Sequence, residues 1–458
     1  MSFLSSFLLT ACSYFSLLLA LAVPAYADDL LQIYRDAQSN DPIFAAAQAN
    51  YFASIEKSPQ ARAGLLPQIN SQWSRVRNTT SPQSNIGTSP ITPFQTNWNI
   101  SLTQPLFRWD RWQSYQQGKL SEISAQLQLT QAQNELILRV TQAYFDLLVA
   151  QDSLALTQSK RHSLQAQLAQ AKHNFEIGAA TIVDTHDAQA RHDLAYAQEI
   201  AAQSELELKQ GALAQITNKP SSTVAGLRTN AIIPSLAPAH ATEWVKQAEQ
   251  NNTAIMLAQI SLEVAQREKN KAGSGHFPSV DLIASRTYSD QIGPPTSASN
   301  TLNAPPAISG EGDTYSNQIG IQITVPLFSG GAVQSQVRET LALIHRARHD
   351  LENARRNAVQ NTRAAFLGVT SGLAQIQALQ AAQKSAQSAY ASNQLGYEVG
   401  VRINIDVMNA QDQLIATQHD LYKAHYDTLL AYTKLKATVN TLEESDVIWL
   451  NTLLTNTH

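Results

Sequence analysis

Residues 175–189 read FEIGAATIVDTHDAQ, and residues 397–411 read YEVGVRINIDVMNAQ. A shift of 222 positions lays the first segment on the second without a gap. The matched residues are Phe175 with Tyr397, Glu176 with Glu398, Gly178 with Gly400, Asp184 with Asp406, and Ala188-Gln189 with Ala410-Gln411. Similarity at one fixed spacing indicates an internal repeat, so we expect the chain to contain one structural unit twice.

The same relation extends toward the N-terminus with a slightly smaller shift. A shift of 211 lays residues 30–69 on residues 241–280, and a shift of 221 lays Pro105-Leu106-Phe107 on Pro326-Leu327-Phe328. We therefore predict a first repeat over residues 28–240 and a second over 241–458. Each repeat is expected to run as helix, strand, polar loop, strand, very long helix, glycine turn and long helix.

The segment Lys119–Ile177 contains neither glycine nor proline over 59 residues. As one helix it would be about 90 Å long. Its apolar positions follow a seven-residue grid, which is typical of a coiled coil. The two columns of that grid are Leu136, Ala143, Ala150, Thr157, Leu164 and Ala171, and Val140, Leu147, Leu154, Arg161, Leu168 and Phe175. We expect each long helix to pack antiparallel on the helix that returns after Gly178 or Gly400.

Four segments have the period-2 pattern of half-buried strands. The clearest alternates Ile319, Ile321, Ile323 and Val325 with Gln318, Gly320, Gln322 and Thr324, and its counterpart contains Trp98, Ile100 and Leu102. The other two lie near 67–77 and 278–288 and, at about 11 residues, suit a tilted crossing of a bilayer. The stretches 79–95 and 289–315 are rich in Ser, Thr, Pro and Gly and predict exposed loops.

Four strands are too few to close a membrane β-barrel. Single-chain bacterial barrels start at eight strands, and open sheet edges are not tolerated in lipid. The strands must therefore be pooled with those of other copies, with the helices continuing the barrel as a hollow bundle.

Residues 1–27 form a long apolar stretch that ends Val-Pro-Ala-Tyr-Ala, and they predict a signal peptide cleaved after Ala27. The only cysteine, Cys12, follows Leu9-Thr10-Ala11, a string that resembles a lipoprotein cleavage box, but the apolar run continues beyond it. Cleavage after Ala27 would leave a mature chain without thiol chemistry.

Composition argues against several function classes. The 32 Lys and Arg against 36 Asp and Glu give a net charge of −4, which does not suit a nucleic-acid partner. The segment Asp184-Thr185-His186-Asp187 and the pair His345 and His349 contain metal-ligand types. We interpret them as solvated helix faces, and we expect neither a metal, a cofactor nor an enzymatic activity.

The motifs and their order resemble the TolC family of trimeric outer-membrane exit ducts, which serve efflux pumps and type I secretion. The similarity extends from Asp28 to about Trp449. The motifs that support it are Ala63-Gly64-Leu65-Leu66-Pro67-Gln68, Gln104-Pro105-Leu106-Phe107, Val325-Pro326-Leu327-Phe328-Ser329-Gly330-Gly331, and Gly396-Tyr397-Glu398-Val399-Gly400 followed by Asp406.

This resemblance implies a mostly α-helical fold with membrane β-structure. Three protomers, each giving four strands, would form a twelve-stranded β-barrel continued by an α-helical coiled-coil barrel in the periplasm. A small equatorial domain is implied at about 218–240 together with the stretch after Leu442. The implied partners are two further copies of the chain, outer-membrane lipid, a periplasmic adaptor protein, and an inner-membrane transporter of the RND or ABC type.

The resemblance also implies a gate at the periplasmic end. Family members close it with a tyrosine and an arginine near the second glycine turn, which match Tyr397 and Arg402, with Asp184 as acceptor. A charge-assisted bond of this kind is strong when shielded and breakable by a partner. Where the family has a threonine that also accepts from the arginine, this chain has Val183, so one latch contact is expected to be missing.

Two further features follow from the resemblance. The family's pore constriction has two aspartates three residues apart, which match Asp406 and Asn409, so we expect three carboxylates per trimer there and a weaker cation preference. The turns Gly178-Ala179 and Gly400-Val401 match the tips that meet the adaptor. Glycine there is equally explained as the left-handed residue that ends a helix.

A different class remains open from the residues alone. A non-conducting periplasmic or surface coiled-coil protein would also use long helices, and its strands would pair into an ordinary sheet. Lipid-facing alternation on four strands of membrane length favours the channel, because a scaffold does not need it.

Overall fold

A computed structural model describes residues 29–77, 94–220, 223–228, 233–234, 236–292 and 312–454. The expected signal peptide, Cys12 and most of the two polar stretches lie outside these residues. The chain forms two compact units, and the first comprises residues up to Gln48, Thr130–Thr253 and the chain from Arg356 onward. The second comprises Ala49–Leu129 and Ala254–Arg355. Each sequence repeat contributes to both units, so the boundary at 240/241 stays a prediction.

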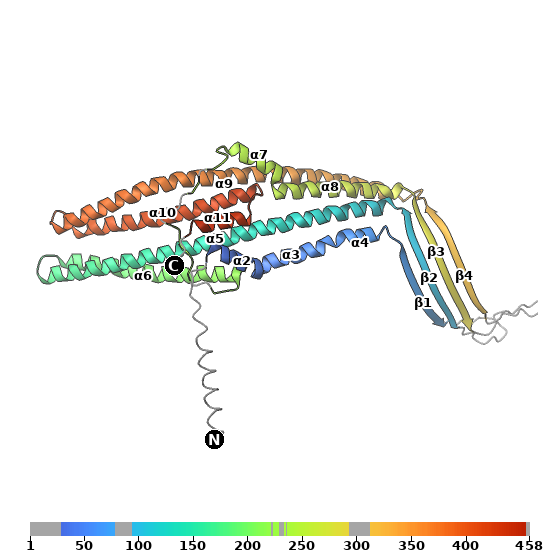
Figure 1. Cartoon of the computed structure of the whole chain (residues 1–458), viewed down its shortest axis with the longest axis horizontal. Helices are drawn as coiled ribbons and strands as arrows, with labels where there is room; N and C mark the ends of the chain where they lie inside the picture. Colours follow the sequence, from blue (N-terminus) through green and yellow to red (C-terminus); the bar gives the residue numbers. More distant parts are fainter. Residues whose placement is uncertain are drawn as a thin grey trace, which may run out of the picture. The chain divides into compact units, whose positions relative to one another are not determined.

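The second unit contains one antiparallel sheet in the order β1-β2-β3-β4 (Figure 1). Its strands are β1 Gln68–Arg77, β2 Phe94–Phe107, β3 Ser279–Ile292 and β4 Gly312–Thr324. Each repeat supplies one hairpin, and β2 pairs with β3 across the repeats. The four expected strands are confirmed, although β3 runs to Ile292, past the expected end at 288.

The register gives the sheet two unlike faces. Directly opposite residues share a face, and on one face Trp73, Trp98, Tyr288 and Tyr315 form a continuous row across all four strands. The neighbouring row on that face is mixed and contains Ser71, Ile100, Arg286 and Asn317, and the row after it contains Ile69, Leu102, Ala284 and Ile319. The rows of the other face contain Asn70, Ser101, Ser285 and Gln318, then Gln72, Asn99, Thr287 and Ser316, then Ser74, Asn97, Ser289 and Thr314. One side of the sheet therefore holds its aromatic row and an aliphatic row among some polar residues, and the three rows given for the other side are entirely polar.

Where the sheet meets the helices of the second unit, one ion pair joins the two repeats. Arg108 donates from Nε and Nη2 to the two carboxylate oxygens of Asp281, at 3.0 and 2.6 Å. Asp281 is buried, so the bidentate pairing satisfies a carboxylate that would otherwise be costly to remove from water. The pair fixes the start of the first long helix to strand β3.

Two very long helices contribute to both units, α5 Trp109–Glu176 and α9 Ala332–Glu398. The shorter helices of the second unit are α4 Lys57–Ala63, the second half of α3 Pro42–Ile55, most of α8 Thr253–Gly273, and the 3-10 turn Ser274–His276. Helix α5 begins ten residues before the predicted Lys119 and passes through Gly118. A Cβ there would lie 3.1 Å from the Lys57 carbonyl oxygen, so glycine permits a close approach of α4.

In the first unit, α5 is followed by α6 Ile182–Thr217, and α9 by α10 Asn404–Thr438, which gives the two expected helical hairpins. The remaining helices there are α2 Leu30–Asn40, α7 Ala241–Asn251 and α11 Glu444–Thr452. None of the helices within the described ranges combines the length and apolarity needed to cross a membrane.

The two segments expected to form an equatorial domain contact each other in the first unit. Leu227 and Leu454 form an isolated antiparallel bridge, and the Arg228 backbone N–H donates to the Leu453 carbonyl at 3.0 Å. Tyr144 of α5 donates its hydroxyl to the Ala225 carbonyl at 2.7 Å. These bonds hold both segments against the helical stem.

Helices α9 and α10 approach closely at small residues. An ideal Cβ on Gly372 would lie 2.3 Å from Oγ1 of Thr428 and within 3.2 Å of its other side-chain carbons. Thr428 is fully buried and bonds to the Ala424 carbonyl, so it has no room to rotate away. Close backbone packing thus replaces large side chains at this point of the hairpin.

We predict that Gly372→Ala destabilises the protein by about 1–3 kcal/mol, because overpacking outweighs the better helix propensity of alanine. Gly211→Ala in α6 is the matched control, since a Cβ there meets nothing within 4 Å. That variant should keep or raise the melting temperature measured by circular dichroism. An equal melting temperature for the two variants would contradict the packing assigned to Gly372.

Candidate functional site

The tips of the two hairpins have the same backbone turn. Gly178 and Gly400 have φ of +76° and +81°, the left-handed region that favours glycine. The two residues after each glycine donate to one carbonyl, that of Asn174 in the first tip and that of Gly396 in the second. Glycine therefore ends each long helix, and contact of Gly178, Ala179, Gly400 and Val401 with an adaptor stays a prediction.

Asp184, the predicted acceptor of the latch, belongs to a capping box at the start of α6. Its Oδ2 accepts from the backbone N–H and the hydroxyl of Thr181, at 2.9 and 2.8 Å. These two hydrogen bonds favour the charged form and lower the pKa of Asp184 below its ordinary value. The carboxylate is exposed, so a second donor can still reach it.

The other two predicted latch residues have different partners within one chain. Arg402 forms an ion pair with Asp406 at 3.7 Å, one helical turn along. The Tyr397 hydroxyl accepts from Nδ2 of Asn174 at 3.4 Å, which links the second tip to the first. Within the described residues of a single chain, the structure brings Arg402 to Asp406 and not to Asp184, so the latch remains a prediction.

The predicted constriction residues Asp406 and Asn409 both carry a basic partner. Besides the Arg402–Asp406 pair, Arg191 of α6 donates from Nη2 to Oδ1 of Asn409 at 3.3 Å. Arg191 also pairs with Asp187, four residues earlier in its own helix, at 3.3 Å. The side chain of Asn409 thus accepts a hydrogen bond from the Arg191 guanidinium. The number of carboxylates at the predicted constriction does not reveal this positive charge.

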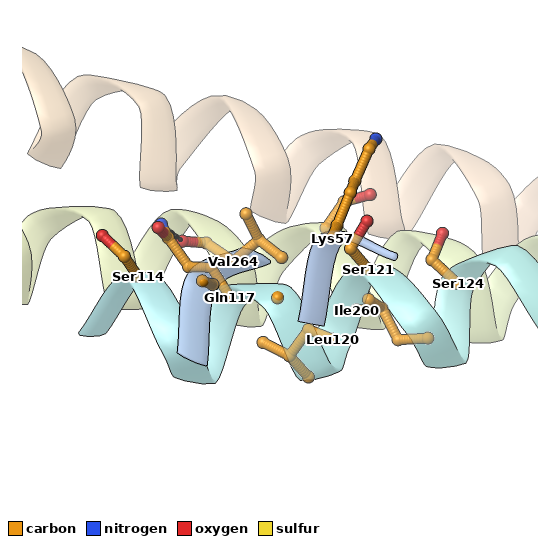
Figure 2. Close-up of a pocket in the computed structure, with 11 residues that line it drawn as sticks. Lys57, Ser114, Gln117, Leu120, Ser121, Ser124, Ile260 and Val264 are labelled. Carbon is orange, nitrogen blue, oxygen red and sulfur yellow. Dashed lines mark hydrogen bonds between the residues drawn. The ribbon is translucent and has the colours of Figure 1, made fainter. Parts of the chain in front are cut away.

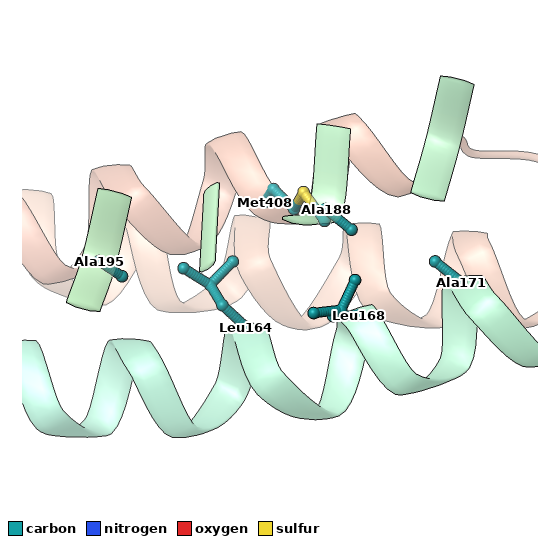
Figure 3. Close-up of a cluster of buried hydrophobic side chains, with 6 residues drawn as sticks. All are labelled: Leu164, Leu168, Ala171, Ala188, Ala195 and Met408. Carbon is teal, nitrogen blue, oxygen red and sulfur yellow. The ribbon is translucent and has the colours of Figure 1, made fainter. Parts of the chain in front are cut away.

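A small apolar cluster lies beneath these polar groups (Figure 3). It contains Leu164, Leu168 and Ala171 of α5, Ala188 and Ala195 of α6, and Met408 of α10. The methionine is the only contribution from α10, and methionine is a flexible side chain that fills irregular gaps. Within this cluster, the apolar contact between α10 and the first helical hairpin therefore consists of one α10 side chain.

Farther along the stem, α10 is fixed to α5 by buried groups. Tyr426 donates to Oδ2 of Asp152 at 2.6 Å, and its ring stacks on Phe145 with centroids 5.6 Å apart. Burial raises the pKa of Asp152, and the hydrogen bond from Tyr426 opposes that effect. The stem is thus held by desolvated contacts, whereas the tips rely largely on exposed polar ones.

Exposed apolar side chains gather at both tips. Those of the first tip are Ile177, Ile182 and Val183, and those of the second are Val399, Val401 and Ile403. Val183 is 69% exposed and Val401 is 76% exposed. A grouped set of exposed aliphatic residues commonly marks a protein contact surface.

Within the second unit, a cavity of about 530 Å³ lies between α4, α5 and α8 (Figure 2). Its lining consists of serine hydroxyls, aliphatic side chains, Lys57 and Gln117, and the Gln117 amide donates to Glu268 at 2.8 Å. This lining lacks the paired nucleophile and base that catalysis uses. Elsewhere in the described ranges, no group of three or more His, Cys, Asp or Glu is placed to hold a metal ion.

Comparison with known proteins identifies the family. The sequence profile described as outer membrane efflux protein matches the chain twice, over residues 33–219 and 244–441. The chain belongs to the outer membrane efflux protein family. The two matches correspond to the two repeats, so the duplication read from the sequence is confirmed.

Two curated relatives and one solved structure show the extent of the similarity. The chain is 31% identical to the outer membrane protein TolC of Vibrio cholerae, over 94% of this chain and 95% of the relative. It is 30% identical to the alkaline protease secretion protein AprF of Pseudomonas aeruginosa, over 94% and 88%. The CmeC outer membrane channel of Campylobacter jejuni has a similar fold, with a TM-score of 0.76, 16% identity and coverage of 93% and 89%.

Membership of the outer membrane efflux protein family confirms the expected fold class, location and broad function. The chain is an outer-membrane channel protein of the efflux and secretion type, and it is not an enzyme. The scaffold interpretation is accordingly set aside.

Sequence analysis missed the basic partners of the constriction positions. Arg191 carries no motif, and its bonds to Asn409 and to Asp412 depend on the packing of α6 against α10. The spacing of four between Asp187 and Arg191 was a visible signal of an ion pair on one helix face. The link from that face to a second helix was not readable from spacing.

We predict that Asp184→Asn speeds amide exchange in the first turn of α6 about two- to fivefold at pH 7, because the capping box is weakened. The wild-type pKa is lowered, so the stabilisation is present above the ordinary aspartate pKa and is lost as pH falls through the folded value. The two proteins should therefore converge in strong acid. Exchange measured by mass spectrometry tests this, with Glu205→Gln on the same helix as control.

Proposed function

We propose that three copies of this chain form a passive exit duct across the outer membrane. The observation that carries the proposal is the four-stranded sheet, which has an aromatic and an aliphatic row on one face and rows of polar residues on the other. An apolar face suits lipid, and a polar face of Asn, Ser, Gln and Thr suits a water-filled lumen. The three sheets would form a barrel of twelve strands, and the helical hairpins would continue it on the periplasmic side.

The aromatic row on the apolar face supports this orientation. Tryptophan and tyrosine are enriched where a membrane meets water, because their rings are apolar and their N–H or O–H groups are polar. Trp73, Trp98, Tyr288 and Tyr315 would form one part of a girdle that three copies complete. Trp109 and Trp112, at the start of α5, lie beyond the strands.

The exposed aliphatic tips support docking of a periplasmic adaptor protein, which would connect the duct to an inner-membrane transporter. Both an RND exporter and an ABC secretion machine fit a passive duct, since cargo choice then rests mainly with the transporter. The resemblance to a protein named for alkaline protease secretion supports protein cargo, and the family description supports efflux of small molecules.

The tips would also form the gate. We propose that Asp184, Tyr397 and Arg402 keep the pore nearly shut and that Asp406 and Asn409 surround its narrowest part. Opening would untwist the tips while the stem stays fixed by its buried contacts. Because Arg402 pairs with Asp406 in one chain, the bond from Arg402 to Asp184 would form in the assembled trimer.

We predict that the purified protein gives a small, cation-preferring conductance in planar bilayers. Tyr397→Phe combined with Arg402→Ser should raise the conductance severalfold, because it removes the hydroxyl and the guanidinium that hold the tips. Tyr422→Phe with Lys423→Ser makes the same types of change in the stem of α10 and should leave the conductance unchanged.

The possible results separate the two parts of this proposal. A large conductance that the tip variant does not change would retain the duct and reject the latch. Absence of conductance in every variant would reject the channel itself.

A further inference from the structure

The Arg191 guanidinium contacts two helices. Within α6 it pairs with Asp187, and across to α10 it bonds to Asn409 at 3.3 Å and to Oδ2 of Asp412 at 3.4 Å. Its side chain is 24% exposed, so it is partly shielded but not removed from water. One side chain therefore connects the start of α6 to two successive turns of α10.

Asp412 extends this contact to a third helix. While Oδ2 faces Arg191, its Oδ1 accepts from the ammonium group of Lys160 in α5 at 2.9 Å. The residue before Asp412, Gln411, accepts from the side-chain amide of Gln167 in α5 at 3.0 Å. Asp412 is thus a shared acceptor at which α5, α6 and α10 meet, and we call Lys160, Arg191, Asn409 and Asp412 the three-helix clasp.

The clasp lies beside the apolar cluster that α5, α6 and α10 share. Met408 is the one α10 residue in the apolar cluster of this region, and Asn409 and Asp412 follow it within about one helical turn. Val407, the residue before Met408, is also buried but does not belong to this cluster. The polar contacts of Asn409 and Asp412 therefore add to the one apolar contact that α10 makes with the cluster.

We infer that the three-helix clasp is a second closure device, separate from the predicted latch at Tyr397 and Arg402. The inference rests on the proposed function as a gated duct. Helix α10 cannot move away from α5 and α6 without separating Asp412 from both cations and Asn409 from Arg191. Exposed ion pairs are individually weak, so the clasp can be released by a partner, and three copies multiply its effect.

The competing explanation is ordinary stabilisation of α6 by Asp187 and Arg191. The chain offers a matched pair of variants to separate the two. Changing either Asp187 or Asp412 to asparagine removes one carboxylate partner of Arg191. The two side chains are almost equally exposed, at 44% and 43%. Asp187→Asn removes only the ion pair within α6, whereas Asp412→Asn removes the ion pairs that α10 makes with Arg191 and Lys160.

The test measures amide exchange over residues 404–415 of α10 and bilayer conductance, in the full-length protein. Asp412→Asn and Arg191→Gln should each raise exchange about two- to fivefold and raise conductance, with Asp187→Asn close to wild type. Combining the first two variants should have less than the sum of their effects, because both remove the Arg191–Asp412 pair. Arg191→Lys should retain much of the hold, since it keeps a charge facing Asp412.

Salt supplies a further readout that a packing defect would not give. Raising KCl from about 0.1 M to about 1 M should shrink the difference between wild type and Asp412→Asn, because exposed charges are screened. Equal effects of Asp187→Asn and Asp412→Asn, or an effect independent of salt, would overturn the clasp. If no variant conducts, the proposed channel fails, and the exchange data alone still decide whether the clasp holds α10.

Discussion

The unpaired backbone edges of β1 and β4 are the constraint on which the rest of the structure depends. Among the residues that the structure describes, the sheet order leaves one long edge of each of these strands without a partner. Lipid offers no hydrogen bonds to peptide groups, so an open edge in a bilayer is strongly unfavourable. Pairing β4 of one copy with β1 of the next satisfies both edges. The sheet of a single chain is therefore only part of a closed barrel.

The duplication follows naturally from that constraint. Each repeat gives one hairpin of the sheet and one helical hairpin, and β2 with β3 joins the repeats by the same antiparallel pairing that operates within each hairpin. The Arg108–Asp281 pair then ties the first long helix to the strand of the other repeat. Two similar repeats thus produce one sheet of four strands, which can pair with the sheets of other copies to close a barrel.

Stem and tip differ in the type of contact that holds them. In the stem, Tyr426 and Asp152 are bonded in a partly desolvated setting, and glycine at 372 lets α9 and α10 pack closely. At the tip, Arg191, Asp412 and Arg402 form pairs that water still reaches. Contacts that water reaches break at lower cost than desolvated ones, which supports the proposal that the duct opens at the tips.

Much of this architecture was readable from the sequence, because it depends on periodicity and repetition. Alternation predicted the strands, the absence of glycine and proline predicted the long helices, and the repeat placed Gly178 and Gly400 at equivalent turns. The capping box of Thr181 and Asp184 was found only in the structure. The start of α5 at Trp109 was not predicted from the sequence, because Gly118 lies inside the helix where α4 approaches closely. The three-helix clasp was not predicted either, because its contacts depend on how three helices pack together and not on the spacing of residues along one helix.

The most direct test of this account is the number of chains in the detergent-extracted protein, measured by native mass spectrometry. Closure through the edges of β1 and β4 predicts one dominant species of three copies. A monomeric protein that remains folded and membrane-extracted would contradict the account, because its sheet edges would then be stable without partners.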